Sequence, residues 1–179
     1  MTESIRDKGT YITVDGRPAV RFIRRYSHSQ QRVWEAITDP EQLSTWYPAT
    51  VSYEPRVGGT IRFVEDQYSM DLTGTVLAYD PPATFAFTWG ENEVRLAVEA
   101  DGPEAAILTL IDVLDAENSA ARNAAGWDVC LRELDNVVHA HAIPTAGPHA
   151  DDAEPWQPIY ESYIADGLPH GAPVPDLGT

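Results

Sequence analysis

The chain has 179 residues, 43% of them hydrophobic, which supports one domain with a sizeable core and excludes wholesale disorder. Its 12 basic and 28 acidic residues give a net charge of −16, so its surface repels phosphate backbones and we expect no nucleic-acid partner. The single cysteine, Cys130, excludes an internal disulfide, and no apolar signal segment follows Met1. No run of about 18 apolar residues exists, so we predict no membrane span and a cytoplasmic protein.

The first part of the chain predicts a hairpin and two short helices. Residues 10–14 and 18–26 have strand-like alternation and flank Asp15-Gly16, a strong hairpin signal. Residues 27–29 can cap a helix over 30–38. An acid followed by proline at 39–40 predicts a second helix that ends near Trp46.

Over residues 49–113 the apolar residues recur at every second position, which is the period of a β-strand. Apolar and polar residues alternate in short runs that are separated by turn signals, namely Gly58-Gly59, Asp80-Pro81-Pro82 and Asp101-Gly102-Pro103. We therefore predict a meander of about six antiparallel strands with one face covered.

The C-terminal part divides at residue 143. Apolar residues recur at spacings of three and four over 119–141, with Ser119 as N-cap, and predict one long helix before Pro144. We take 1–143 as one domain. The tail over 144–179 holds half of the prolines and no basic residue, and we expect a short docked helix near 155–165 within it.

This order of elements predicts an α+β fold in which the long helix buries its apolar stripe, including Leu131, on a curved antiparallel sheet. Large apolar side chains fall on the inward faces. They can fill a core or line a cavity, and the sequence leaves both open for Phe63, Met70, Phe85, Phe87, Trp89 and Trp127.

Several runs resemble a known family. Residues 33–46 (Val-Trp-Glu-Ala-Ile-Thr-Asp-Pro-Glu-Gln-Leu-Ser-Thr-Trp) are similar to the opening motif of the activator of heat-shock-protein-90 ATPase homologue family, of the START-like or SRPBCC superfamily. Further matches lie, in the family's order, at 57–63, 74–82, 87–89 and 126–131. The resemblance covers about residues 10–142 and implies a helix-grip fold with a hydrophobic cavity between sheet and long helix.

The resemblance does not imply one reaction, because the superfamily includes lipid carriers, hormone receptors, cyclases and co-chaperones. The co-chaperone that names the family has a second, N-terminal domain, and these 179 residues do not show one, which argues against chaperone ATPase activation. Many members carry a histidine near the end of the last long strand, where this chain has Asp112.

Three residues have alternative roles. Asp112 either meets solvent at its strand end, which we favour, or points inward as a buried carboxylate with a raised pKa. Tyr68 either points its hydroxyl into the pocket mouth or lies in an ordinary turn. Trp46, which closes the second short helix together with Tyr47, either contacts ligand with it as a lid at the cavity entrance or anchors its helix to the sheet.

Other chemistry has little support. The histidines and Cys130 do not converge at catalytic or ligating spacing, so we predict no cofactor, no metal site and no nucleophilic triad. We interpret Cys130 as a small buried core thiol. No phosphate-binding glycine motif occurs.

Three functions stay open. The first is binding of a small hydrophobic or amphipathic molecule, such as a lipid, polyketide or aromatic compound, in the cavity. The second is a cavity enzyme of cyclase or hydrolase type that uses Asp112 or Tyr68 as acid or base. The third is a stress-related or regulatory interaction module that uses the acidic surface and the tail. A homodimer is compatible with an exposed sheet edge.

Overall fold

The computed structural model describes residues 8–65, 70–140 and 156–174. Its single sheet has the order β1-β2-β8-β7-β6-β5-β4-β3, and every neighbouring pair is antiparallel. The strands are β1 (Thr10–Val14), β2 (Arg17–Tyr26), β3 (Thr50–Tyr53), β4 (Thr60–Glu65), β5 (Met70–Asp80), β6 (Thr84–Trp89), β7 (Asn92–Ala100) and β8 (Ala106–Val113). The N-terminal hairpin thus pairs with the last strand, β8, and the predicted six-strand meander follows in order.

The predicted hairpin is confirmed. Val14 pairs with Arg17, which leaves Asp15 and Gly16 as a two-residue loop. Both have positive φ, +50° and +78°, and this conformation matches the twist of the flanking strands.

The two short helices lie where the sequence predicts them, as α1 (Gln30–Thr38) and α2 (Pro40–Trp46). The Ser29 side chain caps α1 by accepting a hydrogen bond from the backbone N–H of Arg32 (3.1 Å). Pro40 begins α2, whose last residue, Trp46, donates its indole N–H to the Ala36 carbonyl (3.0 Å). That hydrogen bond fixes α2 against α1.

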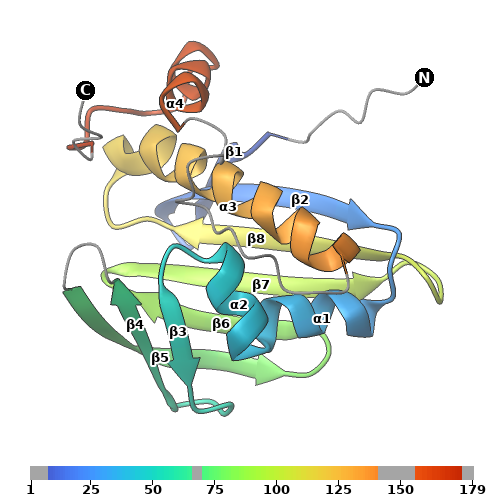
Figure 1. The fold of residues 1–179 in the computed structure, drawn as a ribbon. Coiled ribbons are helices and arrows are strands. Elements are labelled where there is room, and N and C mark those ends of the chain that lie inside the picture. Colours follow the sequence, from blue (N-terminus) through green and yellow to red (C-terminus); the bar gives the residue numbers. More distant parts are fainter. Residues whose placement is uncertain (1–7, 66–69, 141–155, 175–179) are drawn as a thin grey trace, which may run out of the picture.

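The long helix α3 (Ala120–Ala140) follows a short 3-10 turn, η1 (Glu117–Ser119), and lies across the sheet on the face that α1 and α2 also cover (Figure 1). Its apolar stripe packs on the buried face of β2, β6, β7 and β8. This arrangement confirms the predicted helix-grip fold. The predicted last position of the long helix, residue 141, lies outside the described residues.

The sheet bends at Gly74. The first half of β5 pairs with β4 and the second half with β6, and the register shifts between Val76 and Ala78. A Cβ atom at Gly74 would lie 2.2 Å from the Thr88 carbonyl oxygen, so only glycine allows this close approach of the strands. The bend brings β3 and β4 toward the helices (Figure 1).

A short C-terminal helix, α4 (Trp156–Ala165), lies against α3 (Figure 1). The Tyr163 hydroxyl donates to the Asp128 carboxylate of α3 (2.7 Å) and accepts from the backbone N–H of Gly9 (2.9 Å). The contact therefore joins Gly9 and α4 to the long helix. Across the described ranges, no helix combines the length and the apolar character that crossing a membrane requires.

Candidate functional site between the sheet and the long helix

Five aromatic rings meet between the sheet and α3, and we call them the aromatic cluster: Tyr47, Phe63, Phe87, Trp89 and Trp127. Tyr47 is its centre, with ring centroids 5.5 Å from Phe63, 5.1 Å from Trp89 and 5.6 Å from Trp127. These separations are typical of favourable aromatic pairs. Four of the five rings belong to residues that the sequence places on inward faces.

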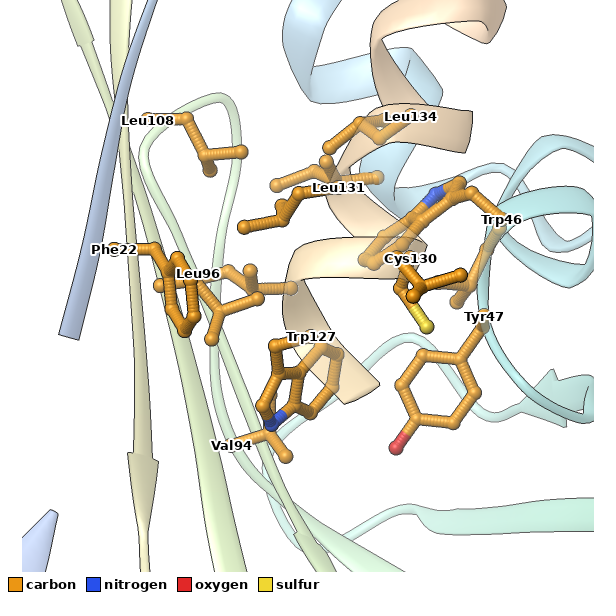
Figure 2. Packing of buried hydrophobic residues seen from close by; sticks show 14 of the residues in the cluster. Phe22, Trp46, Tyr47, Val94, Leu96, Leu108, Trp127, Cys130, Leu131 and Leu134 are labelled. Atoms are coloured by element: carbon orange, nitrogen blue, oxygen red, sulfur yellow. The ribbon is translucent and has the colours of Figure 1, made fainter. Parts of the chain in front are cut away.

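The cluster draws its rings from separate elements. Phe63 comes from β4, Phe87 and Trp89 from β6, and Trp127 from α3. Tyr47 follows the last residue of α2 and lies on the connection to β3. In Figure 2, Trp127 lies between the strand that carries Val94 and the segment that carries Tyr47.

A buried carboxylate lies behind the cluster. Asp112, on β8, accepts three side-chain hydrogen bonds: from Asn92 Nδ2 (3.0 Å), Asn123 Nδ2 (3.1 Å) and Trp127 Nε1 (2.9 Å). Asn92 also accepts from the backbone N–H of Asp115 (3.0 Å) through its Oδ1. The network joins β7, β8 and α3, and Trp127 belongs to both the network and the cluster.

Register and helical spacing bring these groups together. Asp112 pairs with Val94 of β7 and Val20 of β2, so it lies on the central strand of three. Asn123 and Trp127 are one turn apart on α3 and therefore point the same way. The expectation that Asp112 meets solvent at its strand end is wrong, because the side chain is 0% exposed.

Two opposing effects act on this carboxyl. Burial removes water from the charged form and raises the pKa of Asp112 above its ordinary range. The three N–H donors favour the charged form and oppose that rise, but burial is the larger effect. Three donors aimed at one carboxylate also fix its position, so Asp112 is a rigid polar group next to aromatic walls.

The other predicted site residues have different surroundings. Phe85 is fully buried, and its ring centroid lies 5.1 Å from that of Phe87 in the cluster. Leu131 is fully buried in the core, and Trp46 is fully buried with its indole bonded to α1, which is the position of an anchor. Tyr68 and the side chain of Met70 lie outside the described residues.

The cluster rings pack on one another, and all but Trp89 are buried. Two hollows open elsewhere on the described surface, and no cluster residue lines either of them. One, of about 420 Å³, lies between η1 and the segment after α4. The other, of about 340 Å³, lies between α1 and the ends of β3 and β5.

Sequence reasoning missed Asn92 and Asn123, and it placed Tyr47 at the cavity entrance, not at the centre of the cluster. Asn123 precedes Trp127 by four residues, and this spacing was the available signal. Asn92 follows a turn, where asparagine is common for local reasons, so its sequence context carries no distinguishing signal.

The described part of the chain contains neither a reactive cysteine thiol nor a group of metal-ligating side chains. Burial, with a smaller effect of Glu133, raises the pKa of the Cys130 thiol to about 12, which leaves it unreactive near neutral pH. Among the described residues, no three His, Cys, Asp or Glu side chains lie close enough together to hold a metal ion.

A known family matches the part of the chain that carries this geometry. Residues 27–139, more than half of the chain, match the family model described as Activator of Hsp90 ATPase homolog 1-like protein. This chain belongs to that family. The matched range runs from the residues before α1 almost to the end of α3, so it includes the aromatic cluster and the Asp112 network. No curated protein matches the chain.

Solved structures of similar fold come from bacteria. A conserved protein of unknown function, EF2215 from Enterococcus faecalis, has a TM-score of 0.72 at 21% identity, over 89% of this chain and 90% of that one. CalU16 from Micromonospora echinospora has a TM-score of 0.68 at 20% identity, and the match covers 94% of this chain and 100% of that one. DynU16, a protein of the dynemicin biosynthetic locus, has a TM-score of 0.61 at 22% identity, and the match covers 70% of this chain and 48% of that one. At these identities the likeness concerns the fold alone.

Proposed function

We propose that this chain binds a small apolar or amphipathic molecule at the aromatic cluster. The observation that carries the proposal is the meeting of five aromatic rings between the sheet and α3, one of which, Trp127, donates a hydrogen bond to a buried carboxylate. Aromatic walls with one fixed polar group are the usual composition of a small-molecule site. The occurrence of the same fold in proteins from biosynthetic loci, such as DynU16, gives further support for a biosynthetic small molecule as the ligand class.

Tyr47 is the ring that a ligand would replace. It touches the other four members of the cluster, and it lies on the connection between α2 and β3 instead of within a strand or helix. A planar apolar ligand in its place would contact the same four rings. The ligand would gain about 25 cal/mol for each Å² of apolar surface that it buries.

The first experiment is native mass spectrometry of the freshly purified protein, compared with its mass after denaturation. Extra mass of a few hundred daltons in the native spectrum would identify a bound small molecule and its approximate size. The second is a titration with a medium-chain fatty acid and with anthraquinone, followed by tryptophan fluorescence, because Trp89 and Trp127 belong to the cluster.

Tyr47→Leu is the matching variant. If the Tyr47 ring competes with the ligand, its removal raises the affinity for anthraquinone. Tyr11→Leu, on the exposed edge strand β1, is the control and leaves the affinity unchanged. A bare native mass, together with no fluorescence response from wild type or Tyr47→Leu, would refute the proposal.

A cavity enzyme is the second candidate, and the raised pKa of Asp112 favours it. A carboxyl whose pKa is raised by burial is a typical candidate for general acid or base catalysis. The geometry gives less support, because Asp112 is fully buried and holds three donors. If a ligand is identified by mass, its conversion by wild type and not by Asp112→Asn would favour the enzyme.

A further inference from the structure

The hollow beside α1 has the composition of a cation site. Its walls include three aromatic side chains, Trp34, Tyr53 and Tyr79, and two acids, Glu35 and Asp39. Its volume of about 340 Å³ is within the range of small-molecule pockets. It shares no residue with the aromatic cluster, so a ligand in this hollow would be independent of a ligand at the cluster.

The sequence brings the walls together from three elements. On α1, Thr38 lies one helical turn after both Trp34 and Glu35, and all three line the hollow. Tyr53 ends β3, and Tyr79 lies near the end of β5. The rings of Trp34 and Tyr79 are 5.8 Å apart and tilted by 53°, and those of Tyr53 and Tyr79 are 6.3 Å apart and tilted by 56°. Tyr79 thus contacts both other rings, and all three residues line the hollow.

The lining of the hollow also carries two acids, Glu35 and Asp39. Glu35 is exposed and accepts a hydrogen bond from Gln31 Nε2 (3.1 Å), and Asp39 accepts one from Gln42 Nε2 (3.0 Å). Both donors are neutral amides, and among the described residues neither carboxylate forms an ion pair with lysine or arginine. No basic residue occurs among the described residues that line the hollow.

The end of α1 forms part of the wall, through Thr38 and the cap residue Asp39. The Tyr53 hydroxyl donates to the carbonyl of Thr38 at this end, which holds the tyrosine ring in place at the wall of the hollow.

We propose that this hollow binds an organic cation with a quaternary or alkylated ammonium head group. The faces of aromatic rings attract such cations through their negative quadrupole, and carboxylates at the rim add a direct charge attraction. A hard metal ion is a poorer fit, since three of the walls offer rings and few oxygen ligands.

The test compares a cation with its neutral analogue of the same shape. Protein labelled with 15N is titrated at constant ionic strength with choline and, separately, with 3,3-dimethylbutanol, in which carbon replaces the charged nitrogen. We expect choline to shift the indole N–H signal of Trp34 in a saturable way and the neutral analogue to bind at least about fivefold more weakly. Equal binding of both, or no shift at Trp34, would overturn the proposal.

Variants separate the two parts of the site. Glu35→Gln with Asp39→Asn removes both charges while keeping side-chain shape, and we expect choline affinity to fall about tenfold. Glu41→Gln is the matched control, an exposed acid on the first turn of α2 that does not line the hollow.

Tyr79→Leu removes a ring and should weaken choline binding, whereas Tyr79→Phe keeps the ring and should restore it. Their amide spectra also show whether each variant is folded. Unchanged choline affinity in the double charge variant, or in a folded Tyr79→Leu protein, would also overturn the proposal.

Discussion

Two groups of aromatic residues lie on the helix-covered face of the sheet, and they differ in access and in charge. The aromatic cluster around Tyr47 is closed, and the carboxylate behind it, Asp112, is surrounded by N–H donors. The hollow beside Trp34 opens to the surface, and the two acids in its lining accept hydrogen bonds from neutral amides. Phe85 joins the two groups, because its ring centroid lies 5.0 Å from that of Tyr53 and 5.1 Å from that of Phe87.

The difference shows that aromatic content alone does not define a site. The same residue types form a buried core in one place and, with Tyr53 and Tyr79 half-buried, line an open hollow in the other. The position of the acids decides the chemistry. A buried acid with fixed donors orients a polar group, whereas acids at an open rim attract a cation from solvent.

The largest expected effect comes from Asp112→Asn. The amide cannot accept three N–H donors and places its own N–H₂ group against at least one of them. We expect the free energy of unfolding to fall by about 2–4 kcal/mol, as measured by urea denaturation. Asp71→Asn is the control, an exposed acid on β5 paired with Arg62, and should change stability by about 0–1 kcal/mol. Similar losses for both variants would mean that the buried network contributes little.

The pH dependence of the same variant tests the raised pKa. Because the folded-state pKa of Asp112 lies above its ordinary value of 3.8, the folded protein binds this proton more tightly than the unfolded chain. Its contribution to stability is therefore lost as pH rises through the folded pKa, and it increases as pH falls toward 3.8.

Asp112→Asn lacks this contribution. The stability difference between wild type and variant should therefore grow between pH 7 and pH 4 in urea titrations. A difference that shrinks over this range would mean that the three donors outweigh burial and lower the pKa.

The sequence predicted the fold well because its signals are local. The Asp15-Gly16 turn, the Ser29 cap, the Pro40 start and the alternation of the strands each fix one element, and the order of elements fixes the layers. The family motifs then identified the helix-grip arrangement, and the match over residues 27–139 agrees with it.

The surroundings of Asp112 were harder to predict. Residues 107, 109 and 111 are themselves apolar or β-branched, so alternation along β8 does not show which face is inward. The structure puts Leu108, Leu110 and Asp112 on the buried face. The three N–H donors to Asp112 come from residues that are 20, 11 and 15 positions away in the sequence, and no local pattern indicates such contacts.

The sequence pattern likewise indicates only a core position for Trp34. The packing of α1 against β3 and β5 shows that Trp34 also lines a hollow.

A smaller effect is expected from Trp127→Phe. The variant removes the indole N–H that donates to Asp112 (2.9 Å) but keeps a ring in the cluster. We expect a loss of about 1–2 kcal/mol in urea denaturation. Trp89→Phe makes the same change in ring size within the cluster and leaves the three donors to Asp112 in place. If both variants lose the same stability, ring packing and not the hydrogen bond to Asp112 is the cause.

The smallest effect is expected at the open hollow, from Tyr53→Phe. The variant loses the hydrogen bond from the Tyr53 hydroxyl to the Thr38 carbonyl, but Tyr53 is only half-buried, so water can reach the end of α1 and replace the lost donor. We expect a loss of about 0.5–1 kcal/mol in urea denaturation, below that of Trp127→Phe. Because the ring stays in place, choline binding should be retained. A loss as large as that of Trp127→Phe would mean that this hydrogen bond is shielded from water like those of Asp112, and that the two aromatic regions differ less in access than their surfaces indicate.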